Sequence, residues 1–460
     1  MHLAKAYRVG GYVRDTLLGL KPMDVDWVVI DESPESMKAK GFTQVGAFPK
    51  FIHPDTGDDF ALGRSKIMEV TASGDFLYDW RGVTLADDLR RRDLTINAMA
   101  MMDDGSIFDP ANGQEDLRLR ILRHVDDESF LEDPLRILRV ARFAAKFDFP
   151  VAPETMRLMC RMVADGMLAS VKAERIWQET EKALLEVTPR NYFEVLDQCG
   201  ALKVIFPELD RLKGIPQRAD YHAEGDAYVH TLMVVDEATL MTRGHEKSRK
   251  LRIRMAGLLH DLGKANTSVE LLWHPDGSVR GNHYGHESPR MFKAPLNALA
   301  QRIKMPNDVR TFAYRAGLGH QQVHQVQGLG AKGMESLFEL LDLDRVLRYD
   351  DHFLQDLVTF CEADQYGRRT LNADGTVSKP TSYPQGNYFL EAMKPLAELE
   401  VGPVFLESVA KSEAQAERRQ KPFDKAKSIK DAKINVRAAR RAAARRFLGD
   451  VEIDERSPGR

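Results

Sequence analysis

The pattern of apolar and polar positions changes near residue 133. Before it, short apolar runs alternate with turns rich in glycine, proline and asparagine, a pattern that predicts short strands. The candidate strands are residues 6–9, 27–30, 60–62 and 107–108. Gly10-Gly11 forms a turn after the first strand, and residues 12–20 are predicted to be a helix. The N-terminal part should therefore be a mixed sheet with helices.

Beyond Asp133 the apolar residues follow helical periods almost to the end of the chain. Ile137, Val140, Ala141 and Ala144 stand at i, i+3, i+4 and i+7, which gives this helix one apolar face. Residues 156–163 and 176–185 repeat the pattern. The predicted fold class is accordingly α+β, with the sheet confined to an N-terminal head.

Turn-rich segments indicate where the domains end. The chain has 460 residues, more than a single hydrophobic core usually serves. Turns occur near Gly214-Ile215-Pro216 and at residues 372–387. We expect a head at residues 1–132, a helical neck at 133–215, a third helical domain at 216–370 and a helical tail at 371–460.

Charge excludes a protein that is basic overall, because 66 Lys+Arg against 69 Asp+Glu give a net charge of -3. From residue 411 onward, however, 15 Lys+Arg face 8 Asp+Glu. Residues 437–446, RAARRAAARR, concentrate this excess. Two interpretations stay open for this run, which either binds RNA phosphates or forms a solvated helical end.

Cysteine content and the N-terminus point to the cytoplasm. Cys160, Cys199 and Cys361 are too few and too scattered for a disulfide framework or a thiolate metal cluster. The N-terminus reaches charge and glycine too early for a signal peptide, and no apolar run is long enough to span a bilayer. We therefore expect a cytoplasmic protein without a membrane partner.

The head contains a candidate metal site for phosphate chemistry. Asp24 and Asp26 are two residues apart at the start of a predicted strand, so both carboxylates should project from one face. Oxygen ligands of this kind suit Mg²⁺ and two-metal displacement at phosphorus. The Gly10-Gly11 turn and Arg14 would add backbone N–H groups and a cation for a triphosphate.

These features together resemble the polymerase β-type nucleotidyltransferase core. The run GGYVRDTLLGLKPMDVDWVV is similar to the signature of class II tRNA nucleotidyltransferases, the CCA-adding enzymes, and of the related bacterial poly(A) polymerases. RRDLTINAMA, residues 91–100, resembles the second motif of this family. Asp109-Pro110, Gly113 and Asp116-Leu117 resemble its hinge motif, and EDPLRILRVARFAAKF, residues 132–147, resembles its nucleotide-selecting helix.

The resemblance implies an activity and a set of site residues. The activity is addition of the 3′ CCA end to tRNA from CTP and ATP by a monomer or homodimer, with Mg²⁺ on the catalytic Asp24 and Asp26. Asp133 and Arg136 would hydrogen-bond the Watson–Crick edge of the incoming base. The further nucleotide-binding residues are Gly11, Arg14, Arg92, Arg139 and Arg142, whereas Glu174, Arg175 and Glu179 are expected to be scaffold.

The Asp133 assignment also has a physical argument and a competing one. A carboxylate acceptor beside a guanidinium fork one helical turn later can mimic a base edge. Asp133 followed by Pro134 is equally a good helix N-cap with proline at the first helical position. The two roles are compatible, because a cap would hold the side chain that reads the base.

Most of the 13 histidines lie between His222 and His352. His260-Asp261, in GLLHDLGK, resembles the adjacent pair of HD-type metal phosphohydrolases, which CCA-adding enzymes of the enterobacterial type also carry. With His230 and a closing Asp364, this pair gives a mixed ligand set that favours Ni²⁺, Co²⁺ or Mn²⁺. The resemblance implies hydrolysis of 2′-phosphates or 2′,3′-cyclic phosphates.

Further histidines complete the predicted pattern. His286 and His320 lie between His260-Asp261 and Asp364 in the sequence and would allow a second ion. For His286, His320 and Asp364, an ordinary structural role is equally well supported. Ordinary hydrogen-bonded roles are expected for the others, namely His222, His245, His274, His283, His324 and His352.

The sequence departs from the enterobacterial pattern in one segment of the head. Gly63-Arg64-Ser65-Lys66 stands where that subgroup reads Ala-Arg-Thr-Glu, and residues 67–78 match poorly. The third carboxylate of the nucleotidyltransferase site is consequently open, with Asp58 or Asp59 as candidates and a surface acidic pair as the competing interpretation. Two functional alternatives remain, a poly(A) polymerase of the same family and a non-catalytic RNA-binding protein.

Overall fold

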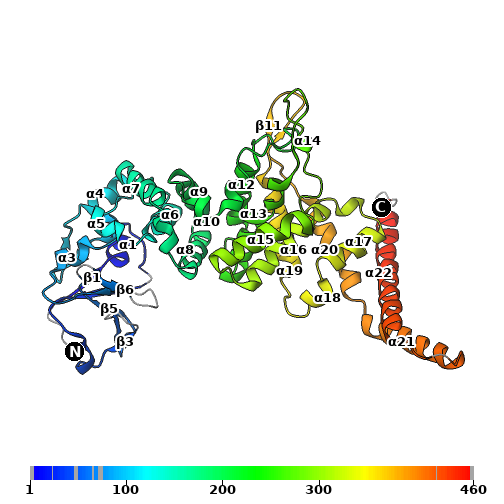
Figure 1. Ribbon diagram of the computed structural model, residues 1–460, viewed down its shortest axis with the longest axis horizontal. Helices are drawn as coiled ribbons and strands as arrows, with labels where there is room; N and C mark the ends of the chain where they lie inside the picture. The colour runs from blue at the N-terminus through cyan, green and yellow to red at the C-terminus, as the bar shows by residue number, and fades with distance from the viewer. Residues whose placement is uncertain are drawn as a thin grey trace. The chain divides into compact units, whose positions relative to one another are not determined.

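The computed structural model describes residues 5–22, 24–45, 50–64, 67–70, 76–420 and 422–455 (Figure 1). The chain divides into two compact units. The first is Met1–Asp210 with Arg302–Lys304, and the second is Arg211–Gln301 with Met305–Arg460. The division at Asp210 lies close to the turn-rich segment that the sequence marks near residue 215.

The first unit is built on a seven-stranded mixed sheet, in the order β3-β4-β5-β2-β1-β8-β9 (Figure 1). β2 and β5 pair in parallel, and the other neighbours pair antiparallel. All four predicted strands belong to it. The strands are β1 Ala6–Val9, β2 Asp26–Val29, β3 Thr43–Val45, β4 Lys50–Ile52, β5 Asp59–Leu62, β8 Ala100–Met101 and β9 Ile107–Phe108, beside a separate pair, β6 Ile67–Val70 and β7 Phe76–Tyr78.

Helices cover both faces of the sheet because successive strand residues point to opposite sides. Val28 packs with Leu89 of α3 (Leu85–Arg90) on one face. Val29 packs with Met37 of α2 (Pro34–Ala39) on the other. The alternation along β2 therefore buries the last two residues of this strand in two different cores.

The rest of the first unit is helical. α6 (Arg136–Phe147) packs on α8 and α9. Its predicted apolar stripe is buried throughout, since Ile137, Val140, Ala141 and Ala144 are each at most 1% exposed. The other helices are α1 Gly11–Leu17, α4 Gly113–Leu119, α5 Asp127–Leu131, α7 Pro153–Ala164, α8 Ala173–Leu185, α9 Pro189–Gln198, α10 Ala201–Ile205 and α11 Pro207–Asp210.

The second unit is a helical body around one core. Leu337, Phe360, Phe389, Met393 and Ala444 belong to the same cluster. Residues after 371 thus share the core of the preceding helices, where the sequence suggests a separate tail. The helices after Asp210 are α12 Ala227–Met241, α13 Lys247–Leu259, α14 Val269–Leu272, α15 Pro289–Ile303, α16 Asn307–His324, α17 Ala331–Leu340, α18 Leu343–Val346, α19 Phe353–Gly367, α20 Pro384–Ala397, α21 Val401–Arg418 and α22 Lys425–Glu455.

One detail differs from the predicted all-helical C-terminal part and its tail. β10 (Thr370–Leu371) and β11 (Val377–Ser378) form a small hairpin, because Gly375 takes a positive φ of 80° in the turn between them. Among the described residues, no helix combines the length and the apolar composition that crossing a bilayer requires.

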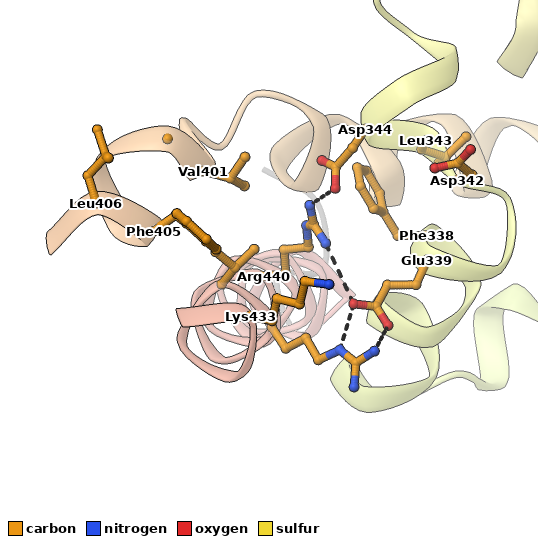
Figure 2. Close-up of a pocket in the computed structure, with 13 residues that line it drawn as sticks. Phe338, Glu339, Asp342, Leu343, Asp344, Val401, Phe405, Leu406, Lys433 and Arg440 are labelled. Atoms are coloured by element: carbon orange, nitrogen blue, oxygen red, sulfur yellow. Dashed lines mark hydrogen bonds and ion pairs between the residues drawn. The ribbon is translucent and has the colours of Figure 1, made fainter. Parts of the chain in front are cut away.

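Part of the basic run near the C-terminus packs against acidic helices of the second unit (Figure 2). Arg440 of α22 is 3% exposed and pairs with Asp344 of α18. Arg437 pairs with Glu339 at 2.6 Å, and Arg441 lies 3.2 Å from Glu335, both acids of α17. These three arginines are therefore paired with acidic helices, whereas Arg445 and Arg446 of the same run are exposed, so both interpretations of the run stay open for them.

Candidate active sites

The head brings three carboxylates to the start of two parallel strands. β2 begins at Asp26, which is paired in register with Asp59, the first residue of β5. Asp24 lies two residues before β2 rather than within it. Burial together with the negative charges of Asp59 and Asp24 raises the pKa of Asp26, against the opposing charges of Arg92 and Lys50. A divalent cation would relieve the repulsion among these carboxylates.

Asp26 and Asp59 line one cavity of about 250 Å³. Asp88, Lys50, Arg64 and Arg92 also line it. Lys50 pairs with Asp59 at 2.7 Å. Of the two candidates for a third carboxylate, Asp58 and Asp59, only Asp59 lines this cavity. In the segment that departs from the enterobacterial pattern, Ser65 and Lys66 lie outside the described residues.

Gly10 and Arg92 meet at the edge of this site. Gly10 has a positive φ of 64°, and a Cβ atom there would lie 2.8 Å from a terminal nitrogen of Arg92. Arg92 is held from its other side by Asp88, at 3.1 Å. Glycine is therefore favoured by the backbone conformation, and the absence of a side chain lets the guanidinium lie against the turn. Gly11 begins α1 immediately after this turn.

The predicted nucleotide-binding arginines are joined into one network by buried acids. Arg14 donates to Asn97 Oδ1 at 2.5 Å, and Asn97 donates to Asp93. Arg139 donates to the other Asp93 oxygen at 2.7 Å.

The network continues to a second acid, Glu179, which accepts from Arg142 at 2.6 Å. Burial acts to raise the pKa of Asp93, but Arg139, Asn97 and Arg136 hold it well below its usual range. Asp93 and Glu179 thus hold the arginines in place. The sequence predicts such a scaffold role for Glu179 but assigns no role to Asp93.

The proposed base-reading pair lies at the start of α6. Asp133 accepts from the backbone N–H of Leu135 at 3.2 Å, as a capping residue does, although α6 itself begins at Arg136. Both Asp133 oxygens also accept from Arg175, at 3.1 and 2.7 Å. The Arg136 guanidinium is buried and donates to the carbonyl oxygens of Arg91 and Arg92. The RRD motif and the selecting helix are therefore directly connected.

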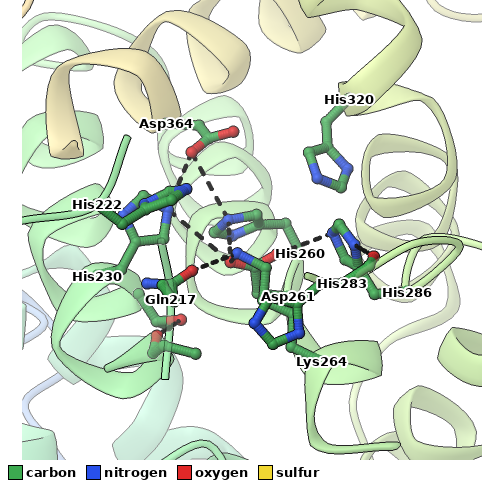
Figure 3. Close-up of polar contacts among 12 residues, drawn as sticks. Gln217, His222, His230, His260, Asp261, Lys264, His283, His286, His320 and Asp364 are labelled. Carbon is green, nitrogen blue, oxygen red and sulfur yellow. Dashed lines mark hydrogen bonds and ion pairs between the residues drawn. The ribbon is translucent and has the colours of Figure 1, made fainter. Parts of the chain in front are cut away.

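The second unit gathers the predicted histidines and aspartates into one buried cluster (Figure 3). Its members are His230 of α12, His260 and Asp261 after α13, His286, His320 of α16 and Asp364 of α19, each at most 4% exposed. Potential ligand atoms of His230, His260 and Asp364 lie within 4.8 Å of one another. The same holds for Asp261, His286 and His320. The six residues thus offer two adjacent ligand triads.

Three of these histidines have their tautomer fixed by the backbone. The Nδ1 atoms of His260, His286 and His320 lie 2.9, 2.7 and 2.8 Å from carbonyl oxygens three residues earlier. A carbonyl only accepts, so each Nδ1 carries the proton and each Nε2 is left to bind a metal. His230 differs, because its Nδ1 lies 2.9 Å from the buried carboxylate of Glu224.

Further side chains fix the carboxylates. Asp364 uses Oδ1 toward His230 at 3.0 Å, and its Oδ2 lies 2.6 Å from His324 Nε2 and 3.0 Å from Arg368. Tyr383 lies 3.1 Å from the other ring nitrogen of His324. Burial acts to raise the pKa of Asp364, but Arg368, His260 and His324 hold it well below its usual range. Asp364 is therefore ionised and oriented.

His324, Arg368, Glu224 and Lys264 are neighbours that sequence reasoning missed. Two of them had a signal, because His324 follows His320 by four residues on α16, and Arg368 follows Asp364 by four. Lys264 lies 2.7 Å from Asp261. His222, expected to be an ordinary residue, hydrogen-bonds Glu224 at 2.8 Å beside His230.

Comparisons with known proteins identify the family of the chain. Residues 6–123 match the Poly A polymerase head domain family, and residues 148–213 match the family described as probable RNA and SrmB-binding site of polymerase A. A multifunctional CCA protein of Dechloromonas aromatica is 44% identical over 403 residues, 86% of this chain and 90% of that protein. The chain belongs to the multifunctional CCA protein family.

Another member is about equally similar, and a solved structure shares the fold. The multifunctional CCA protein of Pseudoalteromonas atlantica is 43% identical over 91% of this chain and 97% of its own length. The Bacillus stearothermophilus CCA-adding enzyme, solved with CTP, has a TM-score of 0.59 at 21% identity, covering 96% of this chain and 88% of that one. At that identity the structural likeness shows the fold alone.

Proposed function

We propose that Asp24, Asp26 and Asp59 hold Mg²⁺ in the head and that the arginine network binds the nucleotide. Membership in the family makes the chain a tRNA nucleotidyltransferase that adds the 3′ CCA end from CTP and ATP. The observation that supports this ligand set is the register of Asp26 with Asp59 on parallel strands, both lining one cavity with Arg92. When bound, Mg²⁺ supplies positive charge at the α-phosphate and assists ionisation of the attacking hydroxyl.

The chain's own residues position the reactants. In the reaction, the tRNA 3′-oxygen forms a bond to the α-phosphorus, the bond to the β-phosphate oxygen breaks, and pyrophosphate leaves. Arg92, beside Asp26 and the Gly10 turn, is placed to bind phosphate oxygens. Asp133 and Arg136 would read the base edge, with Arg175 holding the Asp133 carboxylate at the start of α6.

Product length tests this assignment. Incubating the protein and Mg²⁺ with tRNA that lacks CCA should give two added residues with CTP alone and three with CTP and ATP together. Asp26→Asn should reduce addition by at least about 100-fold, because it removes a charged metal ligand. Addition within a few-fold of the unmodified protein would contradict the ligand set, and a run of adenylates from ATP alone would indicate a poly(A) polymerase.

We further propose that the histidine cluster is a phosphohydrolase centre for 2′-phosphates and 2′,3′-cyclic phosphates. The observation that supports it is the set of imidazoles whose Nδ1 atoms are bonded to carbonyl oxygens, around Asp261 and Asp364. Imidazole with carboxylate suits Ni²⁺, Co²⁺ or Mn²⁺. When bound, such an ion supplies a water of lowered pKa. In hydrolysis, the water oxygen bonds to phosphorus, one ester bond breaks, and the ribose oxygen takes a proton.

Metal binding and hydrolysis test this centre. Metal-free protein titrated with Ni²⁺, Co²⁺ or Mn²⁺ should bind the ion and then hydrolyse 2′,3′-cyclic AMP. His230→Ala should weaken both. Tight binding of the metal ion without hydrolysis would contradict the proposed activity and support the metal site alone. Because tRNA is the substrate of the head, we propose that both activities operate in the cytoplasm.

A further inference from the structure

A second cavity lies beside the histidine cluster. The loop Gln217, Arg218, Ala219 and Asp220 lines it on one side, and His274, Val279, Arg280 and Asn282 line it on the other. Its volume is about 710 Å³, within the range of about 300–1,000 Å³ typical of small-molecule sites. None of these residues belongs to the two ligand triads.

Gln217 connects this cavity to the cluster (Figure 3). Its Oε1 accepts from Lys264 Nζ at 2.5 Å, and Lys264 Nζ lies 2.7 Å from Asp261. The cavity therefore begins two polar contacts away from a proposed metal ligand. Gln217 is thus shared between the cavity wall and the polar surroundings of Asp261.

Gln217 also presents an unused donor. Lysine has no acceptor, so the carbonyl oxygen of the amide must face Lys264 and the NH₂ group must face away. This nitrogen is buried and has no hydrogen-bond partner among the described residues, although Gln217 is only 5% exposed. A buried donor without a partner costs free energy, and a ligand oxygen would satisfy it.

The backbone holds Gln217 in this place. Gly281 has a positive φ of 60°, and a Cβ atom there would lie 2.6 Å from Arg218 N and 2.7 Å from the carbonyl carbon of Gln217. His283 Nε2 lies 2.9 Å from the carbonyl oxygen of Pro216. The two walls are thus packed together next to the amide.

The cavity walls carry two arginines and one acid. Arg218 is paired with Asp220, and both side chains are about half exposed, at 48% and 49%. Such an exposed pair is weak, so Arg218 can exchange it for a phosphate. Arg280 lies 3.3 Å from His274 Nδ1. The excess of guanidinium groups favours a phosphate oxygen, which both can bind with parallel N–H donors.

We propose that this cavity binds the penultimate nucleotide of an RNA whose terminal phosphate is hydrolysed at the histidine cluster. The proposal rests on the phosphohydrolase function stated above. Arg218 and Arg280 bind the internucleotide phosphate, and the Gln217 amide donates to an oxygen of the same nucleotide. An RNA end then occupies two positions, the metal centre with its terminal phosphate and the two arginines with its internucleotide phosphate. A cyclic mononucleotide has one phosphate and occupies only the first, so the centre prefers an RNA end.

The test compares two substrates on the full-length protein. One is 2′,3′-cyclic AMP, and the other is a short oligoribonucleotide that ends in a 2′,3′-cyclic phosphate. The double variant Arg218→Gln with Arg280→Gln should raise KM for the oligonucleotide at least about tenfold, with kcat retained, because charge-assisted hydrogen bonds to phosphate are lost. The KM for 2′,3′-cyclic AMP divided by the KM for the oligonucleotide should therefore fall. Gln217→Glu, which removes the donor and keeps an acceptor for Lys264, should change KM in the same direction.

The control replaces two exposed cations elsewhere on the second unit, Arg290→Gln with Lys293→Gln. This variant should retain the preference for the oligonucleotide, which separates a specific contact from a change of net charge. An oligonucleotide KM that is unchanged in the cavity variant would overturn the inference and leave the hydrolase intact. An equal rise of KM for both substrates would also overturn it. Absence of hydrolysis of either substrate by the unmodified protein, with any of the three metals, would overturn the hydrolase proposal and the inference with it.

Discussion

At the scale of single residues, neighbours decide what each candidate ligand can do. His260, His286 and His320 differ from an ordinary histidine because a backbone carbonyl accepts from Nδ1 and leaves Nε2 toward the cluster. Asp364 differs from a surface aspartate because His324 and Arg368 occupy Oδ2 and leave Oδ1 toward His230. Positioning residues are therefore as informative here as the ligands.

His324 provides the prediction at this scale. His324→Ala should weaken binding of Ni²⁺ or Mn²⁺ by about 10- to 100-fold, because the Asp364 carboxylate loses a partner that orients it. His324→Gln, which can still donate a hydrogen bond, should recover part of that affinity. The measurement is calorimetric titration of metal-free protein, with the exposed His352→Ala as the matched control. Equal affinity in all variants would show that His324 has no positioning role.

At the scale of elements, α6 joins the nucleotide-selecting residues to the scaffold. Its inner face is apolar, and its N-terminal turn lies against the RRD segment through Arg136. Arg139 and Arg142 project from the same helix to Asp93 and Glu179. A change in the position of α6 would consequently move the base-reading residues and the arginine network together.

Arg136→Lys tests whether this helix selects the nucleotide. Lysine keeps the charge but lacks the planar fork, so discrimination against UTP and GTP should fall while tRNA binding changes little. Misincorporation at the tRNA end and tRNA affinity are measured on the same preparation, beside Arg161→Lys on α7 as a control with a largely exposed side chain. Unchanged misincorporation in a folded variant would assign Arg136 to scaffold alone.

At the scale of the whole molecule, two different sets of candidate metal ligands lie in two compact units. The head offers carboxylate oxygens, whereas the second unit offers imidazoles with carboxylates, and these donor sets prefer different ions. The acidic helices α17 and α18 also hold part of the basic run of α22 within the second unit. Each unit thus contains its complete candidate site.

The two activities should therefore be separable in one protein. His260→Ala with Asp261→Ala should abolish hydrolysis of 2′,3′-cyclic AMP, because it removes one ligand from each triad. CCA addition with Mg²⁺ should remain within about twofold of the unmodified protein, because mutations at distant sites act independently. Both activities are measured on one preparation whose thermal unfolding matches the control. Parallel loss of both would show that the histidine cluster stabilises the nucleotidyltransferase as well.

The sequence by itself determined the elements whose signals are local. The β1 strand, the Gly10-Gly11 turn, the apolar stripe of α6 and the His260-Asp261 pair are short-range patterns, because strand alternation, helical period and backbone freedom depend on nearby residues. The short motifs likewise sufficed to indicate the family, since their residues are close together in the chain.

Tertiary structure alone decided which distant residues meet. Asp59 joins Asp26 through the pairing of two parallel strands, and Asp93 and Glu179 reach the arginines from separate elements. Arg437 and Arg440 of α22 pair with acids of α17 and α18, and the local sequence does not reveal these pairs. His324 joins the cluster because α16 and α19 pack together. Such contacts depend on how buried faces pack, which no local pattern of residues encodes.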